Sequence, residues 1–90
     1  MKLFRRRRDA QATIRMMVAS TSQNAATLVA IAKQFEQMAA GTAYCAQQLH
    51  PIVAAHEVRD KLVLQAKALL KARDVFIAGA ASLEDIARKA

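Results

Sequence analysis

Apolar residues recur along the first half of the chain in alternating steps of four and three positions, which is the spacing of one face of an α-helix. This stripe keeps its phase from Ile14 to Leu49. One of its two columns consists of Val18, Ala25, Ala32, Ala39 and Ala46. Alanine at every seventh position lets a partner helix approach more closely than the usual distance of about 8–10 Å. The pattern predicts a long helix with a coiled-coil repeat.

A second apolar row lies beside this stripe and broadens it. Its members are Met17, Ile31, Met38 and Cys45, and Asn24 interrupts them. A face this broad favours a helical bundle over a two-stranded coiled coil. Within this row, Cys45 is expected to be a buried and inert thiol.

Gly41 and Pro51 are the candidate interruptions of the first helix. Glycine costs a helix interior about 1 kcal/mol relative to alanine, but the apolar stripe keeps its phase across Gly41. A kink, a short break and a turn are all compatible with that position. Pro51 is a firmer boundary, because the residue before a proline avoids helical geometry and proline is tolerated in the first turn of a helix. We therefore expect the chain to reverse at Pro51.

A second helix is predicted from Ile52 to Ala78, with two adjacent apolar columns at seven-residue spacing. These columns are Ala55, Leu62, Leu69 and Phe76, and His56, Val63, Leu70 and Ile77. Gly79 is a candidate C-cap, and Ser82 with Asp85 forms a capping box for a short third helix. The acid–base pairs expected to support it are Glu84 with Arg88 and Asp85 with Lys89. The predicted fold is all-α: a long helical hairpin or bundle with a short C-terminal third helix.

The chain divides by charge into residues 1–8, with the sequence MKLFRRRR, and residues 9–90. The first fifteen residues carry six basic and one acidic residue, a net charge of +5, whereas the remaining seventy-five carry eight basic and six acidic residues, a net charge of +2. Like charges repel one another, and no apolar periodicity ties residues 1–8 to a core. We expect a flexible basic N-terminal arm followed by a helical hairpin that serves as an oligomerisation domain.

The four consecutive arginines are the main candidate for binding chemistry. Guanidinium groups are planar donors that suit phosphate oxygens, and this chain has too few acids to pair with all of them. The residues expected to bind nucleic acid or another anionic surface are Lys2, Arg5, Arg6, Arg7, Arg8 and Arg15. Binding to nucleic acid would be driven by counterion release, with little sequence preference.

Three other uses of the same segment stay open. Leu3 and Phe4 beside the arginines could enter a lipid headgroup layer, which would make the protein a peripheral membrane or particle-coat component. The segment could also dock into an acidic pocket of another protein, as in an adaptor or inhibitor. Finally, a charge run is often a solvated terminus without a partner.

The unequal lengths of the two expected helices point to self-assembly. At 1.5 Å per residue the first helix would be about 60 Å long and the second about 40 Å. The apolar stripe from Ile14 to Thr21 would then lack a partner within the chain and would need another subunit. The predicted state is a homo-oligomer, and the predicted interface residues are Ile14, Val18, Ala25, Leu28, Ala32, Phe35 and Ala39.

Nothing in the sequence indicates an enzyme. The residues that could form a nucleophilic or metal site are Cys45, His50, His56 and Glu57, and their spacing matches no known pattern. The two histidines are six positions apart, not the four that align two imidazoles on one helical face. His56 and Asp60 are expected to form an ordinary helix-surface pair. We therefore expect no catalytic residue, metal, cofactor or small-molecule substrate.

The single cysteine and the absence of long apolar stretches bear on the compartment. One cysteine cannot form an intramolecular disulfide, so a reducing compartment such as the cytoplasm is expected. The longest uncharged stretch, Met16 to Ala32, is too polar and too short for a membrane span of about 20 apolar residues. The leading hypothesis is a non-enzymatic assembly or adaptor protein that binds an anionic partner.

Overall fold

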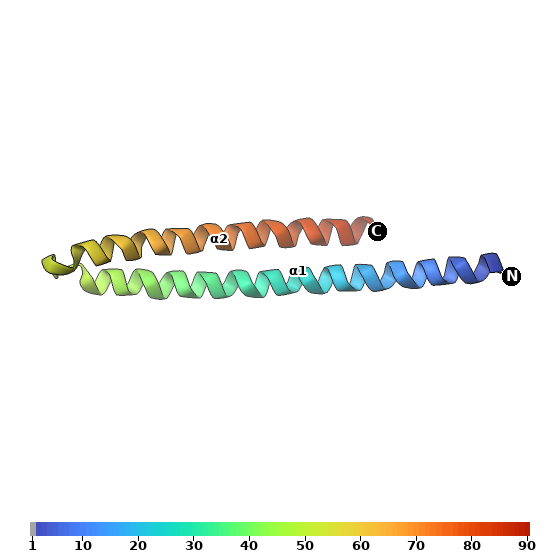
Figure 1. Cartoon of the computed structure of the whole chain (residues 1–90), viewed down its shortest axis with the longest axis horizontal. Helices are drawn as coiled ribbons and strands as arrows, with labels where there is room; N and C mark the ends of the chain where they lie inside the picture. The colour runs from blue at the N-terminus through green and yellow to red at the C-terminus, as the bar shows by residue number, and fades with distance from the viewer. Residues whose placement is uncertain (1) are drawn as a thin grey trace.

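The computed structural model describes the backbone of residues 2–90 and the side-chain surroundings of residues 7–90. The chain forms α1 (Lys2–Leu49), the 3-10 turn η1 (Val53–Ala55) and α2 (His56–Lys89). In Figure 1 the two helices run in opposite directions side by side, as a rod of 79 × 14 × 14 Å. The described residues contain no strand, so the all-α prediction is confirmed.

α1 is one uninterrupted helix of 48 residues. It continues through Gly41 without a break, and neither glycine has a positive φ. A β-carbon at Gly41 would meet nothing within 4 Å. The apolar stripe that keeps its phase across Gly41 thus corresponds to a continuous helix.

The helix extends to the N-terminal side of the expected boundary between residues 8 and 9. Residues 2–8 belong to α1, where a flexible arm was expected. Lysine, leucine and arginine are good helix formers, and a helix that is already nucleated extends at little cost. These two effects account for a helical conformation in spite of the repulsion between like charges.

The reversal at Pro51 is confirmed. α1 ends at Leu49, and three backbone hydrogen bonds hold the turn: His50 N–H to Gln47 O (3.1 Å), Ile52 N–H to Leu49 O (3.0 Å) and Ala55 N–H to Ile52 O (3.0 Å). Proline has no N–H for a helical hydrogen bond, so α1 cannot continue through it unchanged. The turn occupies more residues than expected, and α2 begins at His56 instead of Ile52.

The predicted third helix is wrong, because α2 passes through Gly79 and Ser82 and ends at Lys89. A β-carbon at Gly79 would lie 3.5 Å from Leu28 Cδ1, so α1 packs directly over this glycine. Continued packing and backbone hydrogen bonding outweigh the cost of a glycine in the helix, about 1 kcal/mol. The expected ion pair between Asp85 and Lys89 is present at 3.0 Å.

Alanine forms the contact between the helices. The buried apolar residues are Ala25, Ala32, Ala39 and Ala46 of α1 with Ala66 and Ala80 of α2. Among residues 7–90, no larger side chain is fully buried. Phe35 and Phe76 stack between the helices with ring centroids 5.3 Å apart. The alanine column of α1 therefore lies against α2, and the core is thin.

On α2, one of the two expected columns faces α1 and the other does not. The half-buried column is the expected one with Leu62, Leu69 and Phe76. The second contact column consists of Arg59, Ala66, Arg73, Ala80 and Ala87. The expected second column lies on the flank, where Val63, Leu70 and Ile77 are 38%, 36% and 48% exposed. The prediction of the second column was wrong because the column that contacts α1 contains two arginines, which a hydrophobic pattern counts as polar.

α1 projects beyond the C-terminal end of α2 (Figure 1). The last residue, Ala90, lines a hollow of about 300 Å³ together with Ile14, Met17, Val18 and Ile86. Within the described part of the chain, no helix lies beside the part of α1 that precedes this level. No helix in the described part of the chain has an apolar stretch long enough to cross a membrane.

Candidate anion-binding segment

The projecting end of α1 carries the predicted anion-binding residues except Arg15, which lies at the level where α2 ends. We call residues 2–15 the basic segment. Arg7, Arg8 and Arg15 are exposed on it. The side chains of Lys2, Arg5 and Arg6 lie outside the described residues, but their backbone is part of α1.

Helix geometry fixes how these positions are distributed. Consecutive residues of an α-helix are about 100° apart, so positions 5–8 occupy nearly the full circumference of α1. Arg8 and Arg15 are seven residues apart and therefore share one side. The segment thus presents cationic positions all around a helix and not along a single stripe.

The positive charge of the basic segment is not neutralised within the part of the chain that the structure describes. Arg7, Arg8 and Arg15 take part in none of its ion pairs, and Asp9 is the only acid in the segment. The ion pairs lie elsewhere, on α2 or between α2 and Glu36 of α1. An anion can therefore approach the exposed guanidinium groups without displacing an internal partner.

The predicted oligomer-interface residues are used mostly within the chain. Ala25, Ala32 and Ala39 are buried in the contact with α2. Leu28 and Phe35 are half-buried in the same contact. Leu28 packs over Gly79, and Phe35 stacks on Phe76. Of the remaining two, Val18 is half-buried and Ile14 is 49% exposed. A heptad stripe looks the same whether its partner helix belongs to the same chain or to another, so the sequence alone could not separate these cases.

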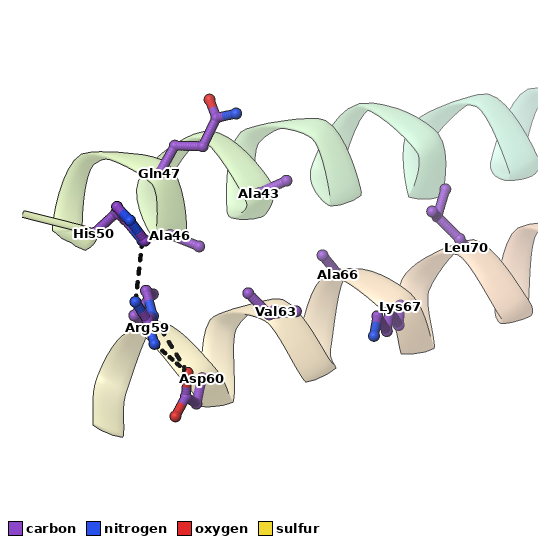
Figure 2. A pocket seen from close by; sticks show the side chains of 10 residues that line it. All are labelled: Ala43, Ala46, Gln47, His50, Arg59, Asp60, Val63, Ala66, Lys67 and Leu70. Atoms are coloured by element: carbon purple, nitrogen blue, oxygen red, sulfur yellow. Dashed lines mark hydrogen bonds and ion pairs between the residues drawn. The ribbon is translucent and has the colours of Figure 1, made fainter. Parts of the chain in front are cut away.

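A polar cluster at the turn was not predicted (Figure 2). Arg59 Nη1 donates to His50 Nδ1 at 3.0 Å, and Arg59 Nε and Nη2 donate to Asp60 Oδ1 at 3.2 and 3.0 Å. His56 Nε2 donates to the carbonyl oxygen of His50 at 3.0 Å, where a pair with Asp60 had been expected. The seven-residue spacing between Arg59 and Ala66 is the feature of the sequence that could have placed Arg59 in the contact with α1.

This cluster closes one end of a groove of about 650 Å³ between the helices (Figure 2). The apolar lining consists of Ala43, Ala46, Val63, Ala66 and Leu70. His50, Arg59, Asp60, Gln47 and Lys67 form the polar part. The groove is an apolar trough with charged walls at the turn.

The residues considered for a nucleophilic or metal site lie at the turn and on the adjoining parts of α1 and α2. The described residues contain no group of three or more His, Cys, Asp or Glu side chains that could hold a metal ion. Cys45 is exposed, so the expectation of a buried thiol was wrong. It lies on the flank of α1 because α2 covers the alanine column and leaves the second apolar row open.

No protein-family model, curated protein or solved structure matches this chain.

Proposed function

We propose that this protein is a non-enzymatic helical adaptor that assembles with itself and binds nucleic acid through the basic segment. The observation that carries the proposal is the projecting end of α1, residues 2–13, which holds a net charge of +4 and has no neighbouring helix in the described part of the chain. Its described arginines are exposed and have no ion-pair partner among the described residues.

The shape of the segment suits a nucleic-acid duplex. An α-helix with side chains is about 10–12 Å across, and the major groove of B-DNA is about 12 Å wide. Cationic positions around the circumference of the helix would meet the phosphates on both sides of the groove. Contacts of this kind give affinity and orientation but carry little sequence information.

Self-assembly is the second part of the proposal. We take the two-helix hairpin as one protomer of a larger bundle, because its core is made of alanine and many large apolar side chains stay exposed. A domain of this size gains stability when a second chain covers such surface. Several basic segments on one assembly would also bind more tightly together than one alone.

The test compares two variants with equal charge. In the first, Arg5, Arg6, Arg7 and Arg8 are replaced by glutamine. In the control, four exposed cations elsewhere are replaced by glutamine: Lys33, Lys67, Lys71 and Arg88. Both variants lower the formal net charge from +7 to +3. Binding to labelled duplex DNA and single-stranded RNA is measured by fluorescence anisotropy at several salt concentrations.

The native protein and the control should bind with a steep salt dependence, with a log–log slope of about −0.9 per phosphate contacted on duplex DNA. The arginine variant should lose this binding and keep its helical circular-dichroism signal. Equal loss in both variants would show that net charge, and not the basic segment, is responsible. Absence of salt-sensitive binding, together with binding to anionic vesicles that is lost when Phe4 is replaced by serine, would overturn the proposal in favour of a membrane function.

A further inference from the structure

The two helices form a single layer, and its two broad faces differ in charge. We call uncharged face the set of flank positions Met17, Asn24, Ile31, Met38 and Cys45 of α1 with Val58, Gln65, Ala72, Gly79 and Ile86 of α2. Two hollows place both flanks on the same side. One of about 540 Å³ is lined by Met38, Cys45 and Gln65, and the other, of about 300 Å³, by Met17 and Ile86. None of the ten residues carries a charge.

The opposite face, which we call the charged face, consists of Arg15, Ser22, Val29, Glu36 and Ala43 of α1, His50 just after it, and His56, Val63, Leu70, Ile77 and Glu84 of α2. The groove of Figure 2 opens on this side, since His50 and Val63 both line it. The two arginines of the contact column also turn toward it: Arg59 contacts His50, and Arg73 Nη1 lies 3.9 Å from Glu36 Oε1. Covering this face would remove several charges from water, which is unfavourable unless each is well paired.

We propose that the uncharged face packs against the same face of a second copy of this chain. This inference rests on the self-assembly part of the proposed function and names its surface. Large apolar side chains are exposed there, including Met17 at 65%, Met38 at 48%, Val58 at 54% and Ile86 at 55%. The lysines at its margin, Lys61 and Lys89, already pair with Glu57 and Asp85 of their own helix.

The area of the face is sufficient for a stable dimer. α2 has 34 residues and is therefore about 50 Å long at 1.5 Å per residue, and the rod is 14 Å wide. A contact along this length covers about 700 Å² per chain, or about 1,400 Å² in total, within the range of about 1,200–2,000 Å² for specific interfaces. Ala72 on α2 is a small residue on that flank, which allows helices to approach closely.

The two copies run in opposite directions. They are related by a two-fold axis that lies between the two faces and is perpendicular to the helices. In this arrangement α1 packs along α1 of the second copy, and the basic segments lie at opposite ends. The same-direction arrangement would bring two segments of charge +5 together. The opposite arrangement also lets the last turns of α1 in each copy cover Ile14 and Met17 of the other, where α2 ends.

This geometry places specific residues opposite one another. With the axis near Ile31, Met17 lies level with Cys45 of the second copy, because both are fourteen positions from Ile31. The two Cys45 thiols would then be about 40 Å apart, at about 1.5 Å per residue. In the same-direction arrangement the two Cys45 residues would be at the same level.

A short bifunctional maleimide on the full chain distinguishes these arrangements. Three proteins are compared: the native chain with Cys45, the Met17→Cys/Cys45→Ala variant, and Met17→Cys with Cys45 retained. The opposite-direction dimer yields a covalent dimer only in the third protein, whereas the same-direction dimer yields one in all three. Ser22→Cys with Cys45 retained is the matched control on the charged face, and it should stay monomeric in a denaturing gel.

A second pair of variants tests the face without cross-linking. Ile31 and Val29 are both half-buried on α1, at nearly the same level but on opposite faces. Ile31→Lys should raise the dissociation constant measured by analytical ultracentrifugation by at least about tenfold, and Val29→Lys by less than about threefold. Circular dichroism checks that both variants remain helical.

The outcomes separate this inference from the proposed function. A native protein that is monomeric at micromolar concentration overturns both the uncharged-face dimer and the self-assembly part of the function. A dimer that cross-links in none of the three proteins overturns the uncharged face alone. Cross-linking as expected without nucleic-acid binding leaves the interface in place and overturns the role of the basic segment.

Discussion

The two helices meet through columns of different character. On α1 the contact column is alanine from Ala25 to Ala46, and these residues are at most 4% exposed. On α2 the corresponding column alternates between alanine and arginine over most of its length, and the side chains of Arg59 and Arg73 are 23% and 27% exposed. The same heptad register therefore accommodates either a methyl group or a long cationic side chain.

The difference shows what a closely packed pair of helices requires. A methyl group fills the narrow space between two backbones. An arginine at the same register runs its aliphatic part along the neighbouring helix and places its guanidinium at the edge, in water. Each of the two guanidinium groups donates to the aspartate that follows it in sequence, Asp60 or Asp74. Close approach therefore depends on the alanines of α1 more than on the composition of α2.

Enlarging one alanine of α1 should have the largest effect on this contact. Ala32 is 2% exposed, so Ala32→Leu must push the helices apart or force strained rotamers. We expect the free energy of unfolding to fall by about 2 kcal/mol, within the usual range for overpacked cores of roughly 1–3 kcal/mol. Urea denaturation at a fixed protein concentration measures this.

The control is Ala30→Leu, at an exposed position of the same helix. It should change stability by less than about 0.5 kcal/mol, since leucine and alanine are both good helix formers. Equal losses at the two positions would mean that Ala32 does not face a neighbouring helix in solution.

Truncating an arginine of α2 should have a smaller effect. Arg73→Ala removes the aliphatic contact with α1 together with the pairs to Asp74 and Glu36, and we expect a loss of about 1 kcal/mol. Arg73→Met keeps the aliphatic contact and should lose less than about 0.5 kcal/mol. Similar losses for both would assign the role of Arg73 to its charge, as would a comparable loss for Glu36→Gln. The measurement is the same urea titration.

A methyl group added to α1 outside the contact column should raise the free energy of unfolding instead of lowering it. A β-carbon at Gly41 meets nothing within 4 Å, so Gly41→Ala adds no clash within the chain. It removes the conformational cost of glycine in a helix, and the free energy of unfolding should rise by about 0.5–1 kcal/mol. A thermal melt followed by circular dichroism would detect the increase, and a decrease would place a neighbour over Gly41 in the assembled protein.

Local signals were sufficient for some parts of the fold. The helical composition, the phase of the stripe across Gly41 and the reversal at Pro51 could all be predicted, because helix propensity and proline geometry act over a few residues. The continuity of α2 through Gly79 could not, since it depends on Leu28, far away in the sequence, which packs over the glycine. The true second column of α2 was missed for a related reason: Arg59 and Arg73 count as polar in a hydrophobic pattern although their aliphatic parts pack.

For the candidate site, the sequence predicted which residues are involved but not that they form part of a helix. The charge of residues 5–8 is visible in the sequence, and so is its imbalance with the rest of the chain. Whether these residues form an arm or a helix depends on the balance between charge repulsion and helix extension, which composition does not decide. The cluster around Arg59 depends on the turn that brings His50 beside α2, so it cannot be predicted from the residues next to Arg59 in the sequence.

Because α1 is one continuous helix, the number of residues between the arginines and the uncharged face sets both the distance and the angle between them. Because one helix joins the arginines to the uncharged face, inserting a single residue between Arg8 and Ile14 would rotate the arginines by about 100° about the helix axis and shift them by about 1.5 Å. Inserting seven residues would return them to within about 20° of their original side and move them about 10 Å outward. Because the four arginines lie about 100° apart around the axis, such a rotation exchanges their places and leaves cationic positions on every side. An insertion therefore acts on this group of cations mainly through its distance from the uncharged face.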